Sequence, residues 1–258
     1  MRRSIRKLLV TVLSLSICIQ IQFASAGIAQ DIQIHYLGHA GFLFQFSNGM
    51  GVVADYAAFH DIGDFKPDVA TYSHGHEDHT GGILPRDMRR DHVLCNAMAL
   101  EMNGLSFSPI ATSETTAGSN DNQSYLMTYQ GFNILHLGDA QADISEIDSE
   151  AERALLKRIR PEKIDLLLIP IGNGVCSITN EEVADFIDFV HPRRVIPMHY
   201  WHFWEKWFFL RYMERRNQAN GQKYNIRKID GPKWSIDISQ PQKEGVIEII
   251  ALEDADYN

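Results

Sequence analysis

The chain has 258 residues, 45% of them hydrophobic, and a formal net charge of −9 at pH 7. This length and composition are those of one large globular domain with a substantial core. The acidic balance, which no basic run offsets, argues against a nucleic-acid partner bound through its phosphates.

The first 26 residues have the pattern of a secretory signal peptide. Four basic residues lie within the first seven, a mostly apolar run without charge covers residues 8–23, and Ala24-Ser25-Ala26 is a small-x-small cleavage site. The run is short and is interrupted by Ser and Gln, which favours a cleaved signal over a permanent membrane span. We therefore expect residues 27–258 to form one exported domain, periplasmic or secreted, with no stable membrane anchor and a net charge of −13.

Residues 32–55 alternate between apolar and polar side chains, which is the pattern of half-buried β-strands. Asn48-Gly49, between two of these runs, predicts a tight turn. The cysteines of the exported part, Cys95 and Cys176, could pair in an oxidising compartment, but their spacing does not show it. We treat both as structural residues.

Residues 73–82 carry the strongest chemical signal in the chain. They follow a strand predicted over residues 68–73 and place three imidazoles and a carboxylate within six residues, namely His74, His76, Asp78 and His79. These groups are ligands that a borderline divalent metal such as zinc prefers. A His-x-His pair leaving a strand can direct both rings at one ion, because positions i and i+2 share a face. The alternative is a histidine-rich surface loop, but the tight spacing favours a metal site with room for a second ion at the Asp-His pair.

The chain then alternates between strand and helix patterns, which indicates an α/β fold. A β-rich run over residues 131–140 ends in Gly138-Asp139, and an amphipathic helix is predicted over residues 149–160. A buried strand over residues 165–171 precedes a helix that Thr179-Asn-Glu-Glu182 begins as a capping box. Two further strands are predicted over residues 195–198, directly before His199, and over residues 245–250.

Seven of the residues from Trp201 to Tyr212 are aromatic, directly after His199. One interpretation is an amphipathic helix that packs most of its rings on the sheet. The other is a wall or lid that gives a substrate pocket an apolar lining. Tyr200, Trp201 and His202 are pocket candidates by position, and Tyr200 or His202 could protonate a leaving group.

The His-x-His-x-Asp-His motif after a short apolar strand resembles that of the metallo-β-lactamase fold hydrolases. The resemblance extends over nearly the whole exported chain and includes residues 37–42, the Gly138-Asp139 pair and the Ile196-Pro-Met-His199 segment. It implies a four-layer αββα sandwich with the metal ligands on loops at one edge. It further implies that Asp139 bridges two metal ions, that His199 is the last ligand of the second, and that Asp55 braces the metal loop. His39 is expected either at the mouth of the site or, more in keeping with its position, as a hydrogen-bonded structural residue.

The sequence departs from the family pattern at one metal ligand. Members carry a further histidine between the first motif and the Gly-Asp pair, whereas residues 107–120 contain none. Thr112, Ser113 and Glu114 are the nearest substitutes by position, and Glu114 could ligate through oxygen. His136, three residues before Asp139, is a second candidate for an additional ligand, although in relatives this histidine is usually not one.

The resemblance implies metal-assisted hydrolysis, closest to a lactonase-like branch that includes ascorbate-6-phosphate lactonase. The ions, two zincs or else one ion, manganese or iron, would lower the pKa of a bound water so that hydroxide exists near neutral pH. Asp78 could orient that hydroxide or carry its proton. An ester, lactone or related small substrate is favoured because no basic cluster for a phosphorylated one is present. A secreted β-lactamase, a phosphodiesterase and a non-catalytic metal-binding protein with an incomplete site are the alternatives.

Overall fold

The computed structural model describes residues 31–82, 93–95, 99–114, 121–141, 157, 159, 163–171, 178–221, 223–240 and 245–253. The predicted signal peptide, most of the helix predicted over residues 149–160, and Cys176 lie outside the described residues, so the export signal, that helix and the cysteine pairing stay predictions. Within the described ranges, every helix is too short or too polar to span a bilayer.

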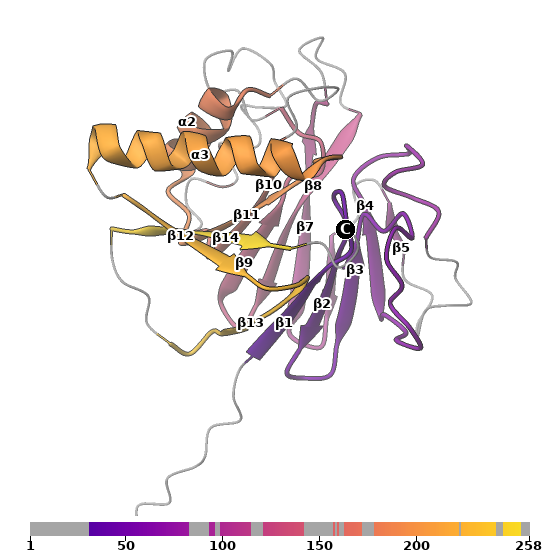
Figure 1. Cartoon of the computed structure of the whole chain (residues 1–258). Coiled ribbons are helices and arrows are strands. Elements are labelled where there is room, and N and C mark those ends of the chain that lie inside the picture. Colours follow the sequence, from indigo (N-terminus) through magenta and orange to yellow (C-terminus); the bar gives the residue numbers. More distant parts are fainter. Residues whose placement is uncertain are drawn as a thin grey trace, which may run out of the picture.

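The strands form two mixed sheets that face each other (Figure 1). The smaller sheet has the order β13 (Lys233–Asp237), β1 (Asp31–Tyr36), β2 (Phe42–Phe46), β3 (Gly51–Ala54), β4 (Val69–Tyr72) and β5 (Val93–Cys95). The alternating pattern of residues 32–55 predicted β1 to β3, and the turn at Asn48-Gly49 is confirmed, since Gly49 has a positive φ and its N–H donates to the Phe46 carbonyl.

The larger sheet has the order β12 (Tyr224–Ile229), β14 (Ile247–Leu252), β11 (Arg194–Met198), β10 (Leu166–Pro170), β9 (Phe132–His136), β8 (Asn122–Tyr129), β7 (Leu105–Thr112) and β6 (Leu100–Met102). The strands predicted near residues 165–171, 195–198 and 245–250 are confirmed as β10, β11 and β14. β7 extends to Thr112, so the stretch expected to supply an additional ligand begins as a strand that pairs with β8.

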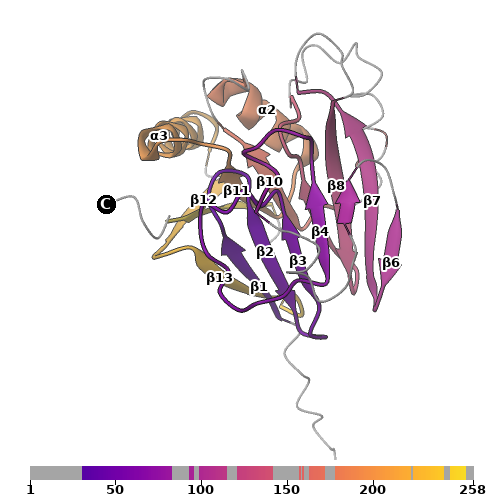
Figure 2. The same cartoon turned by 90° about the vertical axis from the view of Figure 1, so that its right-hand side faces the viewer.

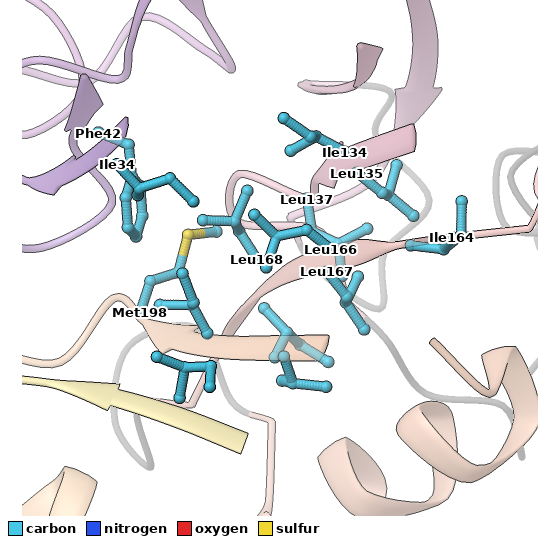
Figure 3. Close-up of a cluster of buried hydrophobic side chains, with 14 of the residues drawn as sticks. Ile34, Phe42, Ile134, Leu135, Leu137, Ile164, Leu166, Leu167, Leu168 and Met198 are labelled. Atoms are coloured by element: carbon cyan, nitrogen blue, oxygen red, sulfur yellow. The ribbon is translucent and has the colours of Figure 1, made fainter. Parts of the chain in front are cut away.

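The main core lies between the sheets. Ile34 and Phe42 of the smaller sheet face Leu168 and Met198 of the larger one (Figure 3), and all four side chains are almost fully buried. β10 is apolar along its whole length because it is the centre of a parallel run, paired with β9 on one side and β11 on the other. A second, smaller cluster lies on the outer face of the smaller sheet, where Ile62 and Phe65 from the loop after β3 pack against Val53 and its neighbours.

Two described helices, α2 (Asn180–Val190) and α3 (Phe203–Asn220), lie on the larger sheet, on the side away from the smaller one (Figure 1). The predicted capping box of α2 is confirmed: the Thr179 side chain accepts from the Glu182 N–H, and the Glu182 carboxylate accepts from the Thr179 N–H at 2.6 Å. Val183, Phe186 and Ile187 point into the core, as their spacing predicted. The two facing mixed sheets with outer helices are the α/β sandwich that the sequence indicated (Figure 2).

The sheet topology brings distant segments to one edge. β3 and β4 are parallel, and so are β9, β10 and β11, so that within each set the chain leaves the strands on the same side. β7 is antiparallel to β8, and β8 is antiparallel to β9, so the end of β7 lies at the same edge as the end of β9. Polar side chains that follow these strands therefore meet although they are far apart in sequence.

Candidate metal centre

The loop after β4 is a tight turn that gathers its own histidines. The His79 and Thr80 N–H groups both donate to the His76 carbonyl, at 3.1 Å each, which closes one turn of chain. Gly82, after the turn, lies against the loop that follows β3 and donates to the Tyr56 carbonyl at 2.9 Å. His74 and His79 are buried, Asp78 is partly exposed and His76 is exposed. The loop therefore places two imidazoles in the interior and one at the surface.

Buried polar groups fix the orientation of the two buried rings. Asp55 accepts a hydrogen bond from the Ser73 N–H at 2.6 Å, and its other oxygen lies 2.9 Å from His79 Nδ1. The Ser73 hydroxyl lies 3.0 Å from His74 Nδ1 and 3.1 Å from His79 Nδ1. With each Nδ1 engaged, the Nε2 atom of each ring is the one available to a ligand, which is how a metal site orients its histidines.

Two clusters of candidate ligand atoms lie side by side. One consists of His74, His76 and Glu114, with His74 Nε2 2.9 Å from His76 Nδ1 and His76 Nδ1 3.6 Å from a Glu114 oxygen. The other consists of Asp78, His79 and His199, together with His39. The ligand atoms within each cluster lie within 4.8 Å of one another, so each set could surround one ion.

Asp139 lies between the two clusters and faces both. Its Oδ1 is 3.2 Å from His79 Nε2 and 3.0 Å from His199 Nε2, while its Oδ2 is 3.6 Å from His74 Nε2. Asn122 holds this residue in place, because its side-chain oxygen accepts the Asp139 N–H at 3.0 Å and its amide donates to the Leu137 carbonyl at 2.9 Å. The structure thus brings together all six residues that the sequence proposed as ligands, and Glu114 with them.

The donor set fits a bound cation. His79 Nε2 is buried and has no hydrogen-bond partner among the described residues, although it points toward Asp139. Burial by itself would lower the pKa of His79, but the Asp55 and Asp139 carboxylates raise it to about 10. Burial would likewise raise the pKa of Asp139, yet the adjacent His199 and His79 hold it well below its usual range. The site gathers negative charge in the interior, which a bound cation would offset.

His39 lies inside the site rather than only near it. Its Nε2 is 3.1 Å from an Asp78 oxygen, and its ring centroid is 3.8 Å from that of His199. The hydrogen bond from His39 is the main reason why the pKa of Asp78 lies far below its usual value. His39 is hydrogen-bonded, as one of the two expectations for it stated, but its partner is a candidate ligand and its side chain is buried.

Three of these residues, His39, Asp55 and His199, have left-handed backbone conformations, with φ of 52°, 43° and 57°. This region is costly for side chains other than glycine and is concentrated at functional sites. The His199 N–H donates to the His39 carbonyl at 2.7 Å, which ties two of the three conformations together. Nothing in the sequence marks these positions as strained.

Aromatic rings form one wall of the site. The Trp201 ring lies 4.2 Å from that of His39 and 5.9 Å from that of Phe59, a residue that sequence analysis missed because it lies on an irregular loop. Ser73 and Asn122 were also missed: Ser73 could have been noted as the residue between the strand and the motif, but Asn122 has no local signal.

Four candidates do not take part in the clusters. His136 is buried, with Nε2 2.9 Å from the Ala40 carbonyl and Nδ1 accepting the Gly138 N–H, so both nitrogens serve the backbone and its ligation is not supported. Tyr200 is part of the core beside Tyr36. His202 precedes α3, is exposed, and stacks on Trp204. Thr112, an alternative to Glu114, has its hydroxyl engaged with Asn122 and Ser124.

Comparison with known proteins places this arrangement in a family. Residues 33–199 match the β-lactamase superfamily domain, and the chain belongs to this family. The chain is 23% identical over 199 residues to a UPF0173 metal-dependent hydrolase of Thermococcus kodakarensis, covering 66% of this chain and 84% of the relative, and 24% identical over 200 residues to one of Pyrococcus furiosus, with the same coverage.

Solved structures show the same fold. A candidate zinc-dependent hydrolase of the metallo-β-lactamase superfamily from Thermotoga maritima superposes with a TM-score of 0.60 at 20% identity, over 86% of this chain and all of that one. The metallo hydrolase Igni18 of Ignicoccus hospitalis superposes with a TM-score of 0.59 at 18% identity, over 80% of this chain and 97% of its own. The expected metallo-β-lactamase fold is therefore confirmed.

Proposed function

We propose that this protein is a metal-dependent hydrolase that cleaves an ester, lactone or related small neutral substrate with water. The observation that carries the proposal is the position of Asp139, whose two oxygens face two separate groups of imidazole and carboxylate ligands. A single bridging carboxylate between two such groups suits a pair of ions better than one. Relatives named as metal-dependent hydrolases support the same activity.

We assign His74, His76 and Glu114 to one ion, and Asp78, His79 and His199 to the other, with Asp139 shared. Four imidazoles with three carboxylates suit zinc, and the carboxylate in place of a histidine also admits manganese or iron. When bound, the ions would lower the pKa of water and polarise the scissile carbonyl.

The chain's own residues supply positioning and proton transfer. Asp78 is partly exposed and lies 3.1 Å from His39 Nε2, so it is placed to orient the attacking water and to carry its proton. The water oxygen bonds to the carbonyl carbon, the bond to the leaving oxygen breaks, and the proton that Asp78 received passes to that oxygen. Trp201 and Phe59 form an apolar wall beside His39, and the sequence contains no basic cluster suited to a phosphorylated substrate. This lining favours a neutral substrate over a phosphorylated one.

We further propose that the protein acts outside the cytoplasm. The pattern of residues 1–26, with its basic start, apolar run and Ala24-Ser25-Ala26 site, supports export. N-terminal sequencing of the protein secreted by expressing cells would begin at Gly27 if this is correct.

The activity is tested with panels of esters, lactones, phosphodiesters and a β-lactam, each with added zinc, manganese or iron. We expect turnover of an ester or lactone, and a loss of at least about a hundredfold in kcat/KM in Asp139→Asn, because one shared ligand serves both ions. Glu77→Gln is the matched control, since Glu77 is an exposed acid of the same loop that belongs to neither cluster, and it should retain full activity. Metal binding without turnover on any panel would contradict the proposal and favour a non-catalytic metal-binding protein.

A further inference from the structure

The exposed large hydrophobic side chains are concentrated on one part of the surface. Among the described residues there are six of them; five lie between residues 201 and 208, and the sixth is Phe59. Four belong to the first two turns of α3 and are 44% to 64% exposed, namely Phe203, Trp204, Trp207 and Phe208. The expectation that this helix packs most of its rings on the sheet was therefore wrong.

These four residues form one face of the helix, which we call the outer face of α3. Positions 203, 204, 207 and 208 are spaced i, i+1, i+4 and i+5, so their side chains point in one direction. Phe209, Leu210 and Met213 form the opposite face and are buried in the core. Packing against the sheet is thus complete without the outer rings, which expose roughly 400 Å² of aromatic surface, as much as the largest patch on a typical monomer.

The chemistry of the outer face suits a lipid interface. It consists of tryptophan and phenylalanine at its start and continues one and two turns later with Arg211 and Arg215, both exposed. Arg211 lies over the Trp207 ring at 5.7 Å and bonds to Glu214 at 2.8 Å, whereas no ion pair of Arg215 is found among the described residues. Aromatic rings at the level of the headgroups, with arginine beside phosphates, are typical of helices that lie in a membrane surface.

The outer face adjoins the candidate metal centre. α3 begins four residues after His199, and Trp201 in the connecting segment contacts His39. His202, the next residue, stacks on Trp204 at 4.0 Å, and Trp204 contacts Phe203 at 5.5 Å, so consecutive residues 201 and 202 connect the rings beside the site to those of the helix. A surface on which the outer face rested would therefore lie close to Trp201, which contacts His39 of the site.

We propose that the outer face of α3 binds the surface of a phospholipid bilayer that contains anionic lipids, with its rings at the headgroup level and Arg211 and Arg215 toward the phosphates. The net charge of −9 opposes anionic lipids in general, so the attraction depends on Arg211 and Arg215 beside the rings. Vesicle binding requires neither a bound metal nor turnover, so this inference can fail while the proposed hydrolase function holds, and the reverse is also true.

The protein offers its own probe. Three of its four tryptophans, Trp201, Trp204 and Trp207, lie in or beside the outer face, and the fourth, Trp234, is buried. The chain beginning at residue 27 is mixed with vesicles of phosphatidylcholine containing one quarter phosphatidylglycerol. We expect the tryptophan emission to shift to shorter wavelengths, brominated lipids to quench it, and the protein to sediment with the vesicles.

The variant Phe203→Ser/Phe208→Ser keeps all four tryptophans and removes two exposed rings. It should weaken vesicle binding by about tenfold or more, because the variant loses the two phenylalanine rings whose transfer from water into the lipid surface favours binding. Gln218→Ser, on the exposed polar end of the same helix, should bind like the unchanged protein. Far-UV circular dichroism and the melting temperature verify that both variants are folded.

Two results would overturn the proposal. One is an emission spectrum and sedimentation that lipid does not alter. The other is a concentration-dependent dimer, detected by analytical ultracentrifugation without lipid, that Phe203→Ser/Phe208→Ser dissociates, which would assign the outer face to a second copy of the chain.

Discussion

At the scale of single residues, the site depends on which nitrogen or oxygen each side chain presents. Ser73 and Asp55 engage the Nδ1 atoms of the buried histidines, and the Nε2 atoms remain for a cation. Asp139 divides its two oxygens between the two clusters. The Glu114 carboxylate lies 4.0 Å from His74 Nε2 and 3.6 Å from His76 Nδ1, so it adds an acidic group to the first cluster.

Glu114 is therefore predicted to be a metal ligand. Glu114→Ala should reduce the bound metal from about two ions to about one per chain, because His74, the exposed His76 and the shared Asp139 would hold the first ion weakly. Glu114→His should restore the second ion and shift preference toward zinc, since imidazole replaces a harder oxygen ligand. Inductively coupled plasma mass spectrometry after gel filtration measures both. Glu77→Ala is the control, and an unchanged metal content in Glu114→Ala would remove Glu114 from the ligand set.

At the scale of elements, close contact between strand ends determines how near the Asp139 segment lies to the metal loop. Gly138 follows β9 with φ of +59°, and a Cβ atom there would lie 2.4 Å from Ser73 Cβ and 2.6 Å from Asn122 Oδ1. The segment that carries Asp139 can approach the metal loop only because this position has no side chain.

Gly138→Ala should lower the free energy of unfolding by roughly 1–3 kcal/mol and weaken metal binding, because Ser73 and Asn122 must move. Gly131→Ala is a matched control: φ is +79° there, but no atom lies within 4 Å of the added Cβ, so only backbone strain is expected. Urea denaturation with metal titration compares them. Equal losses in the two variants would show that backbone strain alone matters at Gly138.

An ionic cluster joins the two helices to the sheet. Asp188 of α2 accepts from Arg216 of α3 at 2.8 Å, pairs with Lys223 at 2.6 Å and accepts a short hydrogen bond from the Tyr224 hydroxyl. Burial would raise the pKa of Asp188, but these three partners lower it overall. Its stabilising contribution is thus present above the ordinary aspartate pKa and is lost as the pH falls through the lower folded value.

Asp188→Asn should lower the free energy of unfolding at pH 7 by about 1–3 kcal/mol, since hydrogen bonds to a charged group are lost. The difference from the unchanged protein should shrink as the pH falls below the ordinary aspartate pKa, and it should vanish below the lower pKa that Asp188 has in the folded protein. Asp185→Asn, whose carboxylate also bonds to Arg216 but is 40% exposed, should cost less. A difference that persists undiminished at low pH would contradict the electrostatic explanation.

At the scale of the whole molecule, the features that could be predicted from the sequence are those with a local motif or a periodic pattern. The alternation in residues 32–55 indicated β1 to β3, and the compact motif of residues 73–82 indicated a metal loop before any fold was known. Asp139 and His199 were placed by family resemblance, because no local pattern says that ends of distant parallel strands meet. The pairing of β7 with β8 and the role of Asn122 depend on long-range register, which a single sequence does not display.

The interpretation in which α3 packs most of its rings on the sheet was the least accurate one drawn from the sequence. Aromatic residues at helical spacing usually indicate a buried face, and here the helix has two apolar faces, of which only the one with Phe209 and Met213 is covered. Spacing alone does not tell which apolar face meets the sheet. The left-handed backbone of His39, Asp55 and His199 could not be predicted either, because the β-strand patterns end before these residues.

We propose that residues from both sheets meet around two cations. Anomalous diffraction at the zinc edge from crystals grown with zinc tests it most directly. We predict two peaks, one among His74, His76 and Glu114 and one among Asp78, His79 and His199, with Asp139 contacting both. Crystals that bind zinc only at other surface histidines, with no peak in reach of Asp139, would contradict it.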